Sequence, residues 1–132
     1  MCIFCKIVAD EIPSYKVYED NDYLAFLDIA PVNPGHTLVI PKKHFVNIED
    51  IDEDTLMGLM RVVKKIGKLV KDNLGYEGYN VYENNDPVAG QVVPHIHFHV
   101  IPRRSDDGLG LWPQKNYSEG GAENILKQML NN

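Results

Sequence analysis

One long amphipathic helix constrains this chain more than any other feature of its sequence. Between Asp52 and Asn73, apolar residues recur at helical spacing, at Leu56, Leu59, Met60, Val63, Ile66 and Val70. Asp52 can cap the first turn, and Gly75 follows the predicted C-terminus. A helix with one apolar stripe must bury that stripe against another layer of structure.

Short strand candidates, rich in β-branched and aromatic residues, lie on both sides of this helix. They are Lys16 to Glu19, Tyr23 to Asp28, His36 to Pro41, Gly78 to Glu83 and Val92 to Ile101. Asn21-Asp22 separates the first two as a hairpin turn, and short helices are predicted at Cys2 to Asp10 and Ala122 to Leu130. This order predicts an α+β fold with an antiparallel sheet of about five strands.

The length of 132 residues suits one domain, residues 1–132, with a core at about 2–104 and a tail at 105–132. The sequence has no apolar run of the roughly 20 residues that span a bilayer, and its N-terminus does not resemble a signal peptide. The net charge of −6 argues against affinity for nucleic acid. Basic residues on the long helix are spaced for a solvated face, at Arg61, Lys64, Lys65, Lys68 and Lys71. We therefore expect a cytoplasmic protein that binds neither nucleic acid nor membrane.

The most informative chemistry lies in residues 95–102, where polar and apolar side chains alternate strictly. Alternate residues of a strand share one face at a spacing of about 7 Å, so His95, His97 and His99 project together. The intervening residues, Ile96, Phe98 and Val100, then pack into the core. A metal site is one interpretation, because imidazole is a common ligand. Three ligands from one straight strand span too far to meet around one ion, so at least one histidine needs another role.

The loop that leads into this strand suggests that role. It contains Asn84, Gly90 and Gln91. Glycine allows close backbone approach, and neighbouring backbone N–H groups can form a concavity for phosphate oxygens. Beside a row of imidazoles, such a loop predicts phosphate chemistry.

The pattern His-x-His-x-His, with apolar residues at x, resembles the histidine-triad (HIT) superfamily. The resemblance runs from Ile3 to about Arg103 and includes separated blocks in the order of the family: residues 3–7, 24–29, 34–44 and 90–91. It points to the branch of small nucleoside phosphoramidases and their bacterial relatives. It implies a HIT-like fold and a homodimer in which two sheets join edge to edge near the long helix.

The resemblance also implies a mechanism and its residues. In this family the middle histidine, here His97, attacks the α-phosphorus, and water hydrolyses the covalent nucleotidyl-histidine. A backbone carbonyl sets its tautomer, and His99 and His36 act as donors to phosphate oxygens or bridging atoms. Asp28 corresponds to the ribose ligand, and Asn84 to a phosphate contact in the loop that also holds Gly90 and Gln91. The positions that enclose a purine are Ile3, Phe4, Ile7, Phe26 and Ile29, although each of these residues also suits an ordinary core.

Val92 departs from the family pattern, because many members carry Ser or Thr at this position of the nucleotide site. Valine keeps the shape and loses the hydroxyl that contacts the phosphate or the leaving group. We expect a lower turnover or an altered preference for leaving groups.

Cys2 and Cys5 are the only cysteines and form a Cys-x-x-Cys pair. A redox dithiol usually follows a strand, and nothing resembling a strand precedes Cys2. A zinc site needs two further ligands, and family members with this pair use the positions of His44 and His95. The resemblance therefore implies a closed, structural Zn²⁺ site, which leaves His97 and His99 free for chemistry.

The expected function is a hydrolase that cleaves P–N or P–O–P bonds of purine nucleoside phosphoramidates or dinucleoside polyphosphates. Two alternatives stay open: a non-catalytic nucleotide-binding module and a zinc-stabilised interaction protein. Trp112-Pro113 in the tail either completes the site of a partner subunit or packs on its own domain.

Overall fold

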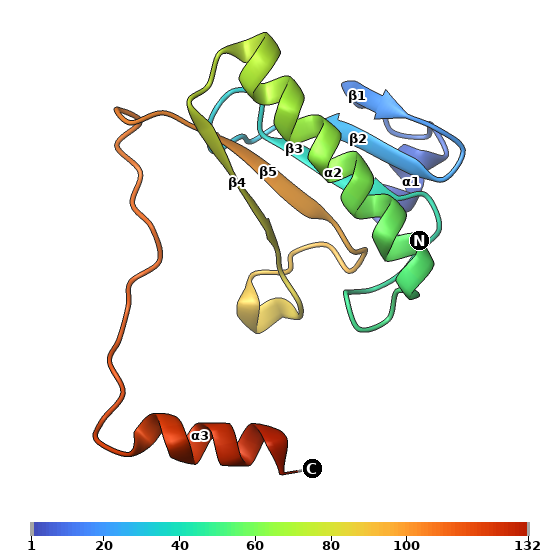
Figure 1. Ribbon diagram of the computed structural model, residues 1–132. Coiled ribbons are helices and arrows are strands. Elements are labelled where there is room, and N and C mark those ends of the chain that lie inside the picture. Colours follow the sequence, from blue (N-terminus) through green and yellow to red (C-terminus); the bar gives the residue numbers. More distant parts are fainter. Residues whose placement is uncertain (1, 132) are drawn as a thin grey trace.

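The computed structural model describes residues 2–131 and contains one antiparallel sheet with helices on both of its faces (Figure 1). The elements in chain order are α1 (Ile3–Val8), β1 (Lys16–Glu19), β2 (Tyr23–Leu27), β3 (Thr37–Pro41), α2 (Glu53–Leu74), β4 (Gly78–Glu83), the 3₁₀ turn η1 (Pro87–Ala89), β5 (Phe98–Arg103) and α3 (Gly121–Leu130). The five strands lie in the order β1-β2-β3-β5-β4, and every neighbouring pair is antiparallel. The predicted α+β fold with one long helix and short terminal helices is confirmed.

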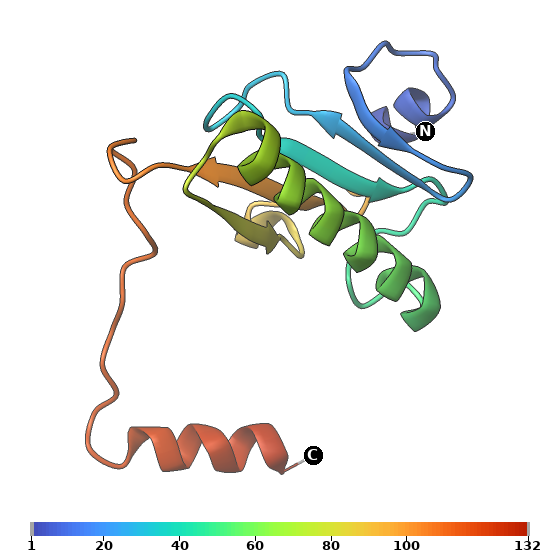
Figure 2. The ribbon, with the colours of Figure 1, turned by 45° about the horizontal axis from the view of Figure 1, so that its top comes forward.

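The central strands are buried on both faces, and alternate residues enter two separate cores. Ala25, Val39 and Val100 face α2, whose apolar stripe Leu59, Val63, Ile66 and Val70 covers them. On the opposite face, α1 packs Phe4 and Ile7 against the remaining side chains of β2 and β3, which are Leu24, Phe26, Leu38 and Ile40. Figure 2 shows α2 crossing one face of the sheet, with α1 lying beyond the sheet. The face that carries α1 is therefore the one on which β5 presents His99.

The ends of α2 follow the sequence signals. The Asp52 carboxylate accepts the Thr55 backbone N–H at 3.0 Å, and Gly75 ends the helix in the left-handed conformation, with φ of 72°. Among residues 2–131, no helix has both the length and the apolar character required to cross a membrane.

The prediction of one strand from Val92 to Ile101 is wrong in its extent, because β5 begins only at Phe98. Pro94 has no N–H to give to a ladder, and the Ile96 N–H bonds to the Phe45 carbonyl, outside the strands, at 2.8 Å. Of the three alternating histidines, only His99 lies in a strand. Pro94 was therefore the residue in the sequence that indicated a shorter strand.

The C-terminal tail leaves the sheet beyond β5 and runs to α3, which stands apart from the rest of the chain (Figures 1 and 2). None of the α3 residues is buried, and Ile125, Leu126, Met129 and Leu130 are all exposed. An isolated helix of ten residues is only marginally stable in water, so the apolar side chains of α3 require a surface to pack against.

Candidate functional site

A cleft of about 520 Å³ opens on the face of the sheet that carries α1. Its walls come from α1, the end of β2, β4, the loop after β4 and the segment around β5. All predicted catalytic and nucleotide-binding residues except His36 and Gln91 line it, namely Ile3, Phe4, Ile7, Phe26, Asp28, Ile29, Asn84, Gly90, Val92, His97 and His99. Residues that lie far apart in the chain thus meet in one cleft.

His97 occupies the floor of this cleft with one ring nitrogen already engaged. Its Nδ1 lies 2.8 Å from the His95 carbonyl oxygen, so Nδ1–H donates and Nε2 carries the free lone pair. Phe4 packs edge-on against the ring, with centroids 5.0 Å apart. Burial lowers the pKa of His97, so the imidazole is neutral at neutral pH.

His36 and His99 form a hydrogen-bonded pair beside it. The Val32 N–H donates to Nδ1 of His36 at 3.1 Å, which leaves the His36 proton on Nε2. That Nε2 lies 2.9 Å from Nδ1 of His99, so His99 accepts there and carries its own proton on Nε2. Burial lowers the pKa of His36 and holds that of His99 at about 4, so both rings are neutral. His36 does not line the cleft, but it is hydrogen-bonded to His99, which does.

Asp28 lies at the rim, where β2 ends. Its Oδ1 accepts the Ala30 N–H at 2.9 Å, and its Oδ2 lies 3.8 Å from Nε2 of His36. Each carboxylate oxygen has more than one lone pair, so the group can still accept from hydroxyls in the cleft.

The loop between β4 and β5 is held in shape by its own side chains. Asp86 and Gly90 have positive φ angles of 72° and 97°, and the Asn84 amide donates to the Gly90 carbonyl at 3.3 Å. The Gln91 side chain accepts from the Asp86 N–H at 2.9 Å and donates to the Val46 carbonyl at 2.6 Å. Gln91 therefore ties the loop to the segment after β3 and does not line the cleft, whereas Val92 is 89% exposed at the rim of the cleft.

A second cluster joins Cys2, Cys5, His44 and His95, whose ligand atoms lie within 4.8 Å of one another. The two sulfurs are 3.1 Å apart, the two Nδ1 atoms are 3.1 Å apart, and the sulfur-to-nitrogen distances run from 3.3 to 3.6 Å. Zinc bonds of about 2.3 Å to sulfur and about 2.0 Å to nitrogen require ligand atoms roughly 3.3–3.8 Å apart in a tetrahedron. His95 donates Nε2–H to the Pro41 carbonyl at 2.8 Å, so its Nδ1 lone pair faces the cluster. The donor set and its size fit zinc.

The sequence interpretation missed Tyr82 of β4, which lines the cleft and stacks on His99. The strand itself was predicted, but the register that sets Tyr82 opposite His99 belongs to the β4–β5 pairing. β4 and β5 are joined by residues 84–97, and a connection of this length does not fix the register as a tight hairpin turn would.

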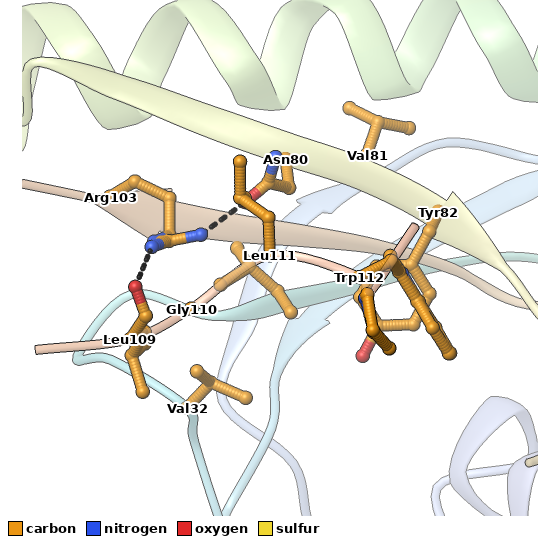
Figure 3. Close-up of a pocket in the computed structure, with 11 residues that line it drawn as sticks. Val32, Asn80, Val81, Tyr82, Arg103, Leu109, Gly110, Leu111 and Trp112 are labelled. Carbon is orange, nitrogen blue, oxygen red and sulfur yellow. Dashed lines mark hydrogen bonds between the residues drawn. The ribbon is translucent and has the colours of Figure 1, made fainter. Parts of the chain in front are cut away.

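A second hollow of about 460 Å³ lies beside the cleft, under the tail (Figure 3). Trp112 and Leu111 border it together with Val81 and Tyr82 of β4, and the Arg103 guanidinium ties Asn80 to the Leu109 carbonyl. Within this chain Trp112 therefore lies over its own domain, although 84% of its surface is exposed.

Comparison with known proteins agrees with this geometry. The family model described as the HIT domain matches residues 9–106. A HIT-like protein of Methanocaldococcus jannaschii is 54% identical over 82% of this chain and 83% of its own length, and an adenosine 5'-monophosphoramidase of Candida albicans is 46% identical over 85% and 78%. The crystal structure of a HIT family member from Bacillus subtilis covers 98% of this chain and 95% of its own, with 42% identity and a TM-score of 0.89. A zinc-bound histidine-triad family protein from Mycobacterium smegmatis covers 98% and 96%, with 38% identity and a TM-score of 0.79.

The chain belongs to the HIT family, which confirms the resemblance read from its sequence. The matched segment contains all five histidines, whereas Cys2 and Cys5 precede it.

Proposed function

We propose that this protein is a nucleotide hydrolase that cleaves the P–N or P–O–P bond at the α-phosphate of purine nucleoside phosphoramidates or dinucleoside polyphosphates. The observation that carries this proposal is the state of His97. The His97 imidazole is neutral, its Nδ1–H donates to the His95 carbonyl, and its Nε2 keeps a free lone pair. The residue lines a cleft of nucleotide size. The related adenosine 5'-monophosphoramidase adds support from similarity.

In the proposed reaction Nε2 of His97 forms a bond to the α-phosphorus, and the bond to the leaving nitrogen or oxygen breaks. The leaving group keeps the electron pair and takes up a proton from solvent. The phosphorylated imidazole gains positive charge, which the His95 carbonyl stabilises through the Nδ1–H bond. Water then attacks the same phosphorus and loses a proton to solvent. The P–N bond breaks, its electron pair returns to Nε2, and the nucleoside monophosphate leaves.

The other residues of the cleft fit binding and charge stabilisation. Nε2–H of His99 is a donor for a phosphate oxygen or the departing atom, and its orientation comes from His36. The backbone N–H groups of Ala89, Gly90 and Gln91 already donate to carbonyls within the loop. Asn84 lines the cleft and uses only one of its two amide hydrogens on Gly90, so it can donate the other to a phosphate oxygen. Asp28 offers acceptors for ribose hydroxyls. The apolar walls suit a purine ring, with Phe4, Ile7 and Phe26 buried and Ile3 and Ile29 exposed at the entrance.

The deciding experiment measures turnover on adenosine and guanosine phosphoramidates and dinucleoside polyphosphates, and traps the intermediate with an α-³²P-labelled substrate. We expect a labelled adduct in the native protein and none in His97→Ala, with a fall in kcat of about 10⁴-fold or more. The exposed change Lys43→Ala is the control. Nucleotide binding without turnover or adduct would favour the non-catalytic binding module. No nucleotide-dependent rise in melting temperature would favour the zinc-stabilised interaction protein.

We also propose a structural zinc ion held by Cys2, Cys5, His44 and His95. When bound, the ion would supply a cross-link between α1, the segment after β3 and the segment before β5, with no open position for substrate. The zinc-bound relative from Mycobacterium smegmatis supports this proposal by similarity.

A homodimer accounts for the surfaces that the single chain leaves uncovered. β4 is an edge strand, Met57 and Met60 of α2 are 60% and 39% exposed, and α3 buries none of its residues. Light scattering should give twice the chain mass. Deletion of residues 109–132 should weaken the dimer, whereas Val88→Ser, in an exposed loop, should not. A monomer at micromolar concentration would contradict the proposal.

A further inference from the structure

We propose that Tyr82 positions His99, by clamping the plane of its imidazole so that Nε2–H stays directed into the cleft. This inference rests on the proposed function, because it assigns a residue to the support of that same site. Neither the family pattern nor the His-rich segment points to Tyr82.

The contact is close and nearly parallel. Tyr82 and His99 are directly opposite each other in the antiparallel pair of β4 and β5, so their side chains share one face of the sheet. The ring centroids are 4.5 Å apart and the planes differ by 16°, which is the geometry of an offset aromatic stack. His97 meets the same imidazole at 5.0 Å with a tilt of 58°, so it does not set the plane.

Two restraints together define one orientation of His99. The bond from Nε2 of His36 to Nδ1 of His99 fixes an edge of the ring at 2.9 Å, but a single bond still allows the ring to twist about it. The stacked Tyr82 ring opposes that twist, since twisting would break the parallel contact. Nε2–H therefore keeps one direction without help from substrate, as a preorganised donor requires.

Tyr82 also lies between the imidazole and the hollow under the tail. It lines both the catalytic cleft and the hollow under the tail, where its side chain lies beside Trp112 (Figure 3). Loss of the ring would join the two spaces and expose one face of His99. The charged or titratable groups that face His99, besides the phenol of Tyr82 itself, are His36, His97 and Asp28. Burial outweighs the Asp28 carboxylate and lowers the His99 pKa to about 4. Burial and Asp28 raise the Tyr82 pKa, so its phenol is neutral and acts through its ring.

The test compares Tyr82→Val with Tyr82→Phe in the full chain. Valine keeps a good strand residue and removes the ring, whereas phenylalanine restores the ring without the hydroxyl. Tyr79→Val is the matched control, because Tyr79 lies on the same strand and packs toward Gly67 of α2 on the other face. The readouts are the ¹⁵N chemical shifts of His99 across pH, measured without substrate, and the pH dependence of kcat.

For Tyr82→Val we expect the His99 pKa to rise by about one unit or more, as water reaches the ring. We expect kcat to fall by about tenfold, while KM changes less. Tyr82→Phe should bring both quantities back toward the native values, and Tyr79→Val should leave the His99 pKa unchanged.

The proposal is overturned if Tyr82→Val and Tyr79→Val leave the His99 pKa equally unchanged. It is also overturned if Tyr82→Phe behaves like Tyr82→Val, because the hydroxyl would then be the important group. The titration needs no turnover, so a failed nucleotide hydrolase assignment would show in the activity of the native protein and not in the ¹⁵N shifts.

Discussion

Nε2 of His36 lies 2.9 Å from Nδ1 of His99, and the Val32 N–H occupies the other nitrogen of His36 at 3.1 Å. This chain of donors fixes the tautomers of His36, which directly precedes β3, and of His99, which lies in β5. The proton offered to the cleft is therefore set by a backbone amide of the turn after β2.

Removing the His36 donor from this hydrogen-bonded chain should lower kcat. His36→Phe keeps a buried ring and removes the donor, so Nδ1 of His99 is left without a partner and the tautomers redistribute. We expect kcat to fall by about 10–100-fold, the usual loss when an orienting hydrogen bond is removed. The control is Thr37→Val, which alters the next buried residue, on the α2 side of the sheet. Equal kcat losses in the two variants would show that the donor chain does not matter.

Stability should rise with pH through the acidic range. The folded-state pKa of His99, about 4, lies below the value of about 6.5 expected in the unfolded chain. Between these values the unfolded chain binds the proton more tightly, so stability increases as pH rises from about 4 to 6.5 and is constant above. Melting temperatures across this window should rise less steeply in His99→Gln. Parallel curves for the two proteins would argue against the lowered pKa.

Zinc should be present in stoichiometric amount and should stabilise the fold. We expect about one zinc per chain in protein purified without chelators, and a fall in melting temperature of at least about 5 °C in Cys5→Ser. Metal content follows from mass spectrometry, with Lys43→Ala as the control. Turnover of the folded fraction should persist after chelation, since no ligand position is left for substrate. A metal-free preparation with unchanged stability would remove the zinc proposal.

Val92→Ser should restore a hydroxyl at the rim of the cleft. One added hydrogen bond to a phosphate or leaving group predicts an increase in kcat of about threefold to tenfold on at least one substrate. Val88→Ser is a matched control, because Val88 lies in the same loop, is 99% exposed and does not line the cleft. Unchanged rates on every substrate tested would contradict the importance of this departure from the family pattern.

Asp28→Asn should remove the preference for ribose. The native protein should favour ribonucleotides over 2'-deoxynucleotides by about tenfold in kcat/KM, since a carboxylate that accepts from both hydroxyls loses one bond in the deoxy substrate. In the variant the two KM values should converge. The kcat for the deoxy substrate serves as the internal control for damage to His36, which lies 3.8 Å from Asp28. A preserved preference in Asp28→Asn would exclude the ribose contact.

Local patterns in the sequence determined the elements and several of their limits. β1 and β4 have the predicted bounds, and Asp52 and Gly75 delimit α2 as their side-chain and backbone chemistry requires. The alternation at Ile96, Phe98 and Val100 correctly predicted which side chains enter the core. The start of β5 was missed, because the absent N–H of Pro94 and the bond from Ile96 to Phe45 outweigh the strand preference of the intervening residues.

The sequence by itself determined the class of fold, the family and the set of histidines that meet. Periodicity and motif spacing depend only on the order of residues along the chain, so they can be read without the structure. Only the tertiary structure decided how these histidines divide their work. The Pro41 carbonyl turns His95 toward Cys2 and Cys5, the His95 carbonyl frees Nε2 of His97, and strand register places Tyr82 on His99. These assignments depend on hydrogen bonds and ring contacts between residues distant in the chain, which only the packed sheet brings within reach.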